Sequence, residues 1–114
     1  MEHKMKLLPE PFELIKTRKK VIEVRLNDEK RQKIKIGDTI VFSKLPDLNE
    51  KLRVKVVGLL HYETFEQLYR DIPFKYFGRE GKTLEWMLES TYKIYTREQE
   101  RKYGVLGIRI ELLE

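Results

Sequence analysis

The residues best suited to chemistry lie in the segment "TRKKVIEVRLND", residues 17–28, which holds Lys20, Glu23 and Arg25. Arginine is a bidentate donor suited to phosphate or to a base edge. A carboxylate between two cations holds both in place or accepts from an amino group on a base. The pattern therefore indicates a site for an anion or a nucleobase. The alternative is a surface ion-pair ladder, which is common and contributes little stability.

The positive charge of the chain is concentrated around this segment. The whole chain has a net charge of +5. Residues 16–35 hold nine basic and three acidic side chains, a net of +6, so the remaining residues sum to −1. A local excess of this kind is typical of an anion-binding surface. The composition also resembles thermophile usage, with many Lys, Glu and Arg and few Asn and Gln, and charges that serve only thermal stability are an alternative.

A second group of candidates would act in acid/base chemistry. His61 and Glu63 are two residues apart and could join Lys20 and Glu23 in one site. His3 lies in an N-terminal stretch that we expect to be a frayed tail, so we predict no metal site. Cysteine is absent, which excludes thiol catalysis, thiolate zinc sites and disulfides. We predict no cofactor.

Aromatic residues and cations are interleaved in residues 69–82, a pattern used to stack unpaired bases. Tyr76 is the expected exposed platform, and Gly78 and Gly81 favour a loop that could close over a ligand. Trp86 lies off the apolar stripe of its predicted helix, on the side with Ser90 and Lys93. We expect Trp86 to pack on a second element, with a ligand contact as the alternative.

Apolar periodicity and capping signals predict the elements that position these residues. Strands are predicted from alternation at residues 20–26, 39–45, 52–63 and 105–113, with Gly58 as a bulge. Helices are predicted at residues 9–17, 64–72, 83–95 and 96–103. The order of a helix, three strands, two or three helices and a final strand predicts an α+β fold. We expect one domain, residues 1–114, built as a small mixed, partly closed β-barrel with flanking helices.

No signal peptide or membrane span is predicted, because no apolar run is long enough. We therefore expect a soluble cytoplasmic protein without membrane partners.

The segment "KKVIEVR" resembles the Gly-x-Lys-x-x-Glu-x-Arg signature of ASCH domains (activating-signal-cointegrator homology), with Lys20, Glu23 and Arg25 on its charged positions. The flanking stretches "PFELIK", "IKIGDTIVF" and "YGVLGIRI" are also similar to family features. The resemblance implies a PUA-like β-barrel whose signature residues line a cleft for RNA or a modified nucleotide. The signature glycine would stand at position 18, where this chain has Arg18. Either the turn there is shaped differently, or the position tolerates Arg18, which could add a phosphate contact.

The first functional hypothesis is therefore a module that binds single-stranded or modified RNA. Its predicted contacts are Arg18, Lys19, Lys20, Glu23, Arg25, Lys30, Arg31, Lys33 and Tyr76. The second hypothesis is a small hydrolase acting on a modified nucleoside or an RNA bond, with Lys20, Glu23 and either Glu63 or His61 as its catalytic candidates. Proteins similar to this family hydrolyse acetylated cytidine with a Thr nucleophile. Glu23 stands at that position here, so the same mechanism is not predicted.

Overall fold

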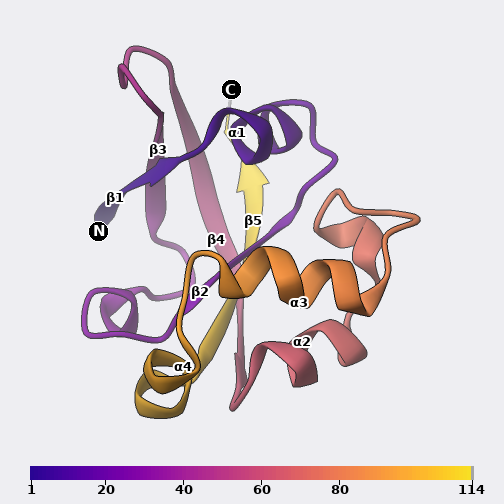
Figure 1. The fold of residues 1–114 in the computed structure, drawn as a ribbon. Helices are drawn as coiled ribbons and strands as arrows, with labels where there is room; N and C mark the ends of the chain where they lie inside the picture. The colour runs from indigo at the N-terminus through magenta and orange to yellow at the C-terminus, as the bar shows by residue number, and fades with distance from the viewer. Residues whose placement is uncertain (114) are drawn as a thin grey trace.

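The computed structural model describes residues 1–113 of the 114-residue chain (Figure 1). Its strands are β1 (Glu2–Leu7), β2 (Ile22–Leu26), β3 (Thr39–Lys44), β4 (Lys51–Tyr62) and β5 (Val105–Leu112). Its α-helices are α1 (Pro9–Lys16), α2 (Phe65–Asp71), α3 (Leu84–Tyr92) and α4 (Arg97–Tyr103), and two short 3-10 turns are η1 (Arg31–Lys33) and η2 (Phe74–Tyr76). Within the described residues no helix is long and apolar enough to cross a membrane.

The strands form one mixed sheet in the order β1-β3-β4-β5-β2. β1 and β3 are parallel, and the other neighbouring pairs are antiparallel. The register between β4 and β5 shifts at Val56/Gly58, which confirms the predicted bulge. The sheet curls into a half-barrel, with α1 at one end and α2, α3 and α4 grouped on the other side (Figure 1). The prediction of an α+β fold with a small mixed, partly closed β-barrel and flanking helices is confirmed.

The expectation of a frayed N-terminal tail was wrong. Residues 2–7 form strand β1, which pairs with β3 along its whole length. Every second side chain of β1 is buried: His3, Met5 and Leu7. His3 Nε2 lies 2.8 Å from a carboxylate oxygen of Asp38, so its ring is partnered inside the fold. The strand was missed because His3 occupies one of its inward positions, and only two apolar residues remained to show the alternation.

The curled sheet is apolar on both faces, which explains why β2 has so few exposed positions. Glu23 and Arg25 pair in register with Ile108 and Leu106 of β5. Both β5 partners belong to the cluster inside the half-barrel, so Glu23 and Arg25 also point inward. Ile22 belongs to the second cluster, beneath α2 and α3. The predicted alternation of β2 is therefore confirmed, and its charged face is the inner one.

Helix α3 is held against α2 and α4 by polar contacts that are buried or partly buried. The Tyr69 hydroxyl of α2 lies 2.7 Å from Thr91 Oγ1 of α3. Glu100 of α4, only 4% exposed, accepts from the backbone N–H of Phe65 at 2.7 Å and from the Tyr92 hydroxyl at 2.8 Å. Because buried polar groups are costly when unpaired, these bonds fix the position of α3 relative to α2 and α4.

Candidate nucleic-acid interface

A cleft of about 850 Å³ lies between the β1–α1 junction, β2 and α3. Its walls are residues 6–11 on one side and residues of α3 with the loop after it on the other. Lys20, Glu23 and Arg25 all line it. The volume falls within the roughly 300–1,000 Å³ that ligand pockets occupy. The structure thus brings the three signature positions to one concave site.

The centre of this charged group is Glu23, which is 3% exposed. One carboxylate oxygen, Oε1, lies 2.8 Å from Lys20 Nζ, and the other, Oε2, lies 2.7 Å from Arg25 Nε. We call these three residues the floor trio. Because one carboxylate neutralises one of two cations, the floor trio carries a net charge of +1.

Glu23 and Arg25 stay ionised over a wide pH range. Burial alone would raise the pKa of Glu23, but the charges of Lys20 and Arg25 and their hydrogen bonds outweigh it and lower the pKa to about 2. Burial acts to lower the pKa of Arg25, and the charge of Glu23 outweighs this effect, so that pKa is raised. At neutral pH Glu23 is therefore a fixed anion that orients two cations.

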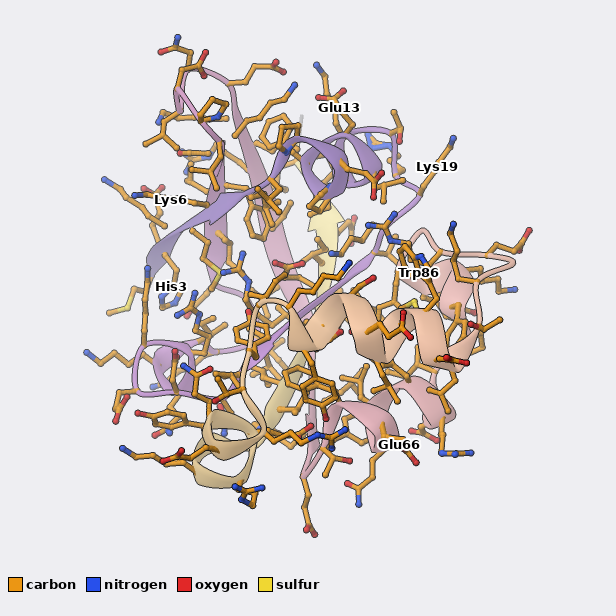
Figure 2. The ribbon with its side chains drawn as sticks, viewed as in Figure 1. His3, Lys6, Glu13, Lys19, Glu66 and Trp86 are labelled. Carbon is orange, nitrogen blue, oxygen red and sulfur yellow. The ribbon has the colours of Figure 1, made fainter. Side chains whose placement is uncertain are left out.

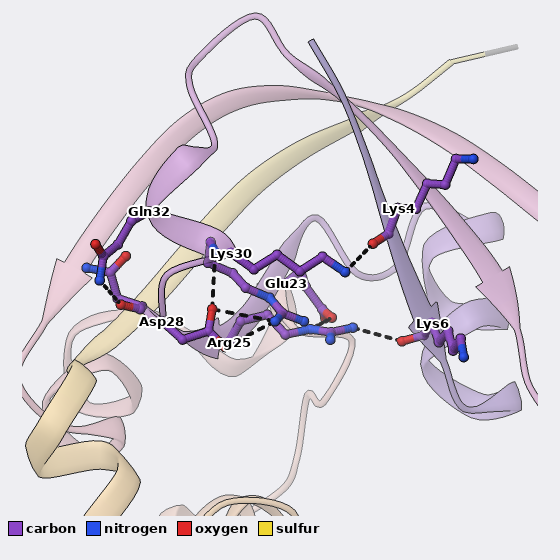
Figure 3. A network of polar contacts seen from close by, with 9 residues as sticks. Lys4, Lys6, Glu23, Arg25, Asp28, Lys30 and Gln32 are labelled. Carbon is purple, nitrogen blue, oxygen red and sulfur yellow. Dashed lines mark hydrogen bonds and ion pairs between the residues drawn. The ribbon is translucent and has the colours of Figure 1, made fainter.

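Arg25 and Lys30 also close the gap between the two edge strands of the half-barrel. Arg25 Nη2 donates to the backbone carbonyl of Lys6 at 2.9 Å, and Lys30 Nζ donates to that of Lys4 at 2.8 Å (Figure 3). Both carbonyls belong to β1, which lies at the opposite edge of the sheet from β2. Side chains thus join the two edges, and Arg25 has a structural role in addition to its place in the cleft.

Lys20 reaches the floor from a tight turn after α1. Its backbone N–H and that of Lys19 both donate to the carbonyl of Leu14, at 3.0 and 2.9 Å. Arg18 lies in this turn with φ 63°, in the left-handed region that favours glycine. The position that corresponds to the signature glycine is therefore left-handed in this chain, although arginine occupies it.

The wall formed by α3 presents the single tryptophan of the chain. Trp86, Ser90 and Lys93 all line the cleft, at the spacing that places them on one side of a helix. The Arg79 guanidinium carbon lies 5.1 Å from the centre of the indole ring, and Lys82 Nζ lies 4.7 Å from it. Figure 2 shows Trp86 on α3, across from α1 and β1. An indole with cations over its ring combines an aromatic surface with positive charge, and a nucleotide's base and phosphate suit such a pair.

At the rim of the cleft, Arg79 forms an ion pair with Glu10 of α1. Both residues line the cleft, and the Glu10 side chain is 70% exposed. Arg79 lies between Gly78 and Gly81, whose φ angles of 73° and 87° are left-handed. We call this contact the rim pair. It connects α1 with the loop that leads into α3.

The cleft as a whole attracts anions. Five basic and two acidic residues line it, a net of +3: Lys6, Lys20, Arg25, Arg79 and Lys93 against Glu10 and Glu23. Aromatic rings lie among them, including Trp86 and Tyr95. Cations interleaved with aromatic faces suit an unpaired nucleotide, whose phosphate and base need different partners.

The other predicted contacts lie outside this cleft. Arg18 borders a smaller hollow beside Ile110. Lys19 and Lys33 are exposed, and Arg31 pairs with Asp28 at 3.1 Å. Lys30 joins the strand edges as described above. Tyr76 is 40% exposed, as predicted, with Lys75 Nζ 5.4 Å from the centre of its ring, but it does not line the cleft.

His61 and Glu63 are exposed at the end of β4 and beyond it, and neither lines the cleft. The structure does not bring them together with Lys20 and Glu23. Of the residues that sequence reasoning left out, Lys6, Arg79 and Lys93 belong to the cleft. Arg79 lies in the stretch of interleaved cations and aromatic residues, residues 69–82, and that pattern was a signal for base stacking. The grouping of Trp86 with Ser90 and Lys93 was a second signal, and for Trp86 packing was given more weight than ligand contact.

Comparison with known proteins agrees with this architecture. The chain is similar to the crystal structure of hypothetical protein PH0355, with 38% identity, a TM-score of 0.88, and coverage of 99% of this chain and 100% of that one. It is also similar to the solution structure of protein PF0455 from Pyrococcus furiosus, with 39% identity, a TM-score of 0.80, and coverage of 100% and 99%. No curated protein matches the chain.

The curled mixed sheet with flanking helices is the α+β, PUA-like architecture that the resemblance of the signature segment implied. The model of the ASCH domain family matches residues 5–114. The chain therefore belongs to the ASCH domain family, as its signature segment indicated.

Proposed function

We propose that this ASCH domain binds single-stranded or modified RNA, or a nucleotide, in the cleft between β2 and α3. The observation that carries the proposal is that three further cations (Lys6, Arg79 and Lys93) and several aromatic rings line the same cleft as the floor trio. Lys20 and Arg25 supply donors to a base edge or a phosphate, and Glu23 orients them. Trp86 supplies a stacking face, and Lys93 and Arg79 attract the phosphate backbone.

A hydrolase at the same cleft has less support. A general base works best with a pKa near the working pH, and Glu23 has a pKa of about 2. The other candidates, His61 and Glu63, do not line the cleft. The chemistry of the described residues therefore favours binding over catalysis.

The test is a fluorescence-anisotropy titration of labelled single-stranded RNA at low and physiological salt. Lys20→Met and Trp86→Ala should each weaken binding about tenfold, since a base-edge contact and a stacking contact are each worth about 1–3 kcal/mol. Lys55 is exposed on β4, outside the cleft, so Lys55→Ala is the matched control for loss of one charge. It should change affinity less than about twofold at physiological salt. Equal binding by all four proteins would refute the proposal.

A further inference from the structure

The hydrogen-bonding groups at the floor of the cleft are mostly donors. Lys20 and Arg25 have donors and no acceptor. Their side chains keep 14% and 13% of their surface exposed, whereas the Glu23 side chain keeps 4%. Each Glu23 oxygen is already paired with one cation. A ligand at the floor therefore meets ammonium and guanidinium hydrogens rather than a carboxylate oxygen, and it must present an acceptor to them.

An acceptor lines the same cleft as these donors. Thr91 Oγ1 donates to the backbone carbonyl of Met87 at 2.8 Å, so its one hydrogen is used. The hydroxyl of Tyr69, 2.7 Å away, must then donate to Thr91, which leaves only lone pairs on the Tyr69 oxygen. Burial raises the pKa of Tyr69 to about 12, so this hydroxyl stays protonated. Tyr69 lines the cleft with Ser90, whose hydroxyl can also accept.

We infer that the cleft selects bases that present a carbonyl oxygen next to a ring N–H, namely uracil, guanine and hypoxanthine. This inference rests on the proposed function and names the class of base the cleft takes. The carbonyl accepts from Lys20, and the ring N–H donates to the hydroxyl side of the cleft. Adenine and cytosine reverse the pattern. Their amino group would face the Lys20 ammonium, leaving two donors opposed.

The test compares inosine monophosphate with adenosine monophosphate, which differ in the base edge and share the sugar and the phosphate. Trp86 is the one tryptophan in the sequence and lines the cleft, so its fluorescence reports binding at this site. Inosine monophosphate should bind about tenfold more tightly than adenosine monophosphate. If the mononucleotides bind too weakly to measure, the affinities for hexauridylate and hexacytidylate are compared instead, since uracil and cytosine differ in the same way at the base edge.

Two variants distinguish base selection from general charge. Lys20→Met keeps most of the aliphatic stem and should reduce the preference to less than about twofold. Lys93→Ala removes a cation from the α3 side of the cleft and should weaken both nucleotides equally, leaving the preference intact. Both variants are first shown to be folded by thermal unfolding.

The outcomes separate the two proposals. Suppose that both nucleotides quench Trp86 fluorescence saturably and bind with equal affinity, or that adenosine monophosphate binds more tightly. Either result would overturn the inference and leave the proposed function standing. A preference that survives Lys20→Met would also overturn it. If neither the mononucleotides nor the hexanucleotides change Trp86 fluorescence, the proposed function itself fails.

Discussion

The cleft contains two ion-paired groups that differ sharply in burial. In the floor trio, Glu23 is 3% exposed and holds one cation with each oxygen. In the rim pair, the Glu10 side chain is 70% exposed and holds Arg79 alone. Removing one partner of a buried ion pair costs about 3–5 kcal/mol, whereas an exposed pair contributes about 0–1 kcal/mol. The floor trio is therefore fixed before a ligand arrives, whereas Arg79 of the rim pair can exchange Glu10 for a ligand.

The largest effect expected from this difference is on the stability of Glu23→Gln. The change leaves Lys20 and Arg25 together without a compensating anion, and we expect a loss of about 3 kcal/mol or more in the free energy of unfolding. Urea denaturation measures it. The matched control is Glu13→Gln, which breaks the exposed ion pair between Glu13 of α1 and Lys44 of β3. This change should cost about 0–1 kcal/mol. Equal losses in the two variants would show that the floor trio is no more structural than a surface pair.

Acid should weaken the fold through the same carboxylate. The pKa of Glu23 in the folded protein, about 2, lies below the ordinary value of 4.5. The contribution of Glu23 to the free energy of unfolding is therefore fully present above pH 4.5. It should decline as pH falls from 4.5 towards 2, by roughly 3 kcal/mol in total. Hydrogen bonds from His3 and from the backbone of Lys35 also lower the pKa of Asp38 to about 2. Protonation of Asp38 therefore adds a decline in stability at low pH in every variant.

The difference between the wild type and Glu23→Gln isolates the part that belongs to Glu23. Chemical denaturation at a series of pH values should therefore give a flatter acid limb for Glu23→Gln. Identical acid limbs for the two proteins would contradict the pKa assignment.

The turn that delivers Lys20 to the floor should respond to glycine. Arg18 has φ 63°, a conformation that costs a side-chain-bearing residue about 1 kcal/mol. Arg18→Gly and Arg18→Ala both remove the arginine side chain, so their comparison cancels its contacts. Arg18→Gly should be more stable than Arg18→Ala by about 1 kcal/mol in thermal or urea unfolding. A more stable alanine variant would show that the turn relaxes out of the left-handed region.

The smallest effect is expected at the rim. Glu10→Gln removes the partner of Arg79, so Arg79 becomes available to a phosphate, and affinity for single-stranded RNA should rise about threefold, a change of less than 1 kcal/mol. Glu13→Gln makes the same charge change on α1 without touching Arg79, and it measures the general effect of removing a negative charge. If both variants raise affinity equally, the rim pair does not restrain Arg79.

The sequence predicted most of the fold because apolar residues alternate clearly in strands such as β2 and recur at helical spacing in helices such as α3. Strand β1 was missed because His3, a polar residue, fills an inward position. The charged face of β2 was predicted, but its burial inside the half-barrel depends on the strand order, which local patterns do not contain. For the same reason Arg79 could not be assigned to the cleft, since its ion-pair partner Glu10 comes from a distant segment of the chain.

The basic window of residues 16–35 proved to be several surfaces rather than one. Lys20 and Arg25 line the cleft, Lys30 joins two strand edges, and Arg31 pairs with Asp28. Charge density along the sequence indicated the segment that holds Lys20 and Arg25. It could not separate the cations that face a ligand from those that hold the fold together, because both kinds lie within a few residues of one another.

The most direct test of the cleft as the binding site is an NMR titration of isotope-labelled protein with hexauridylate. It locates binding without any substitution. The account predicts that the indole N–H of Trp86 and the backbone amides of Lys20 to Arg25 shift together in a saturable manner. Amides of η1, including Arg31 and Lys33, should shift little. Saturable shifts confined to η1, with Trp86 unchanged, would place the ligand on the outer basic surface and contradict the central claim.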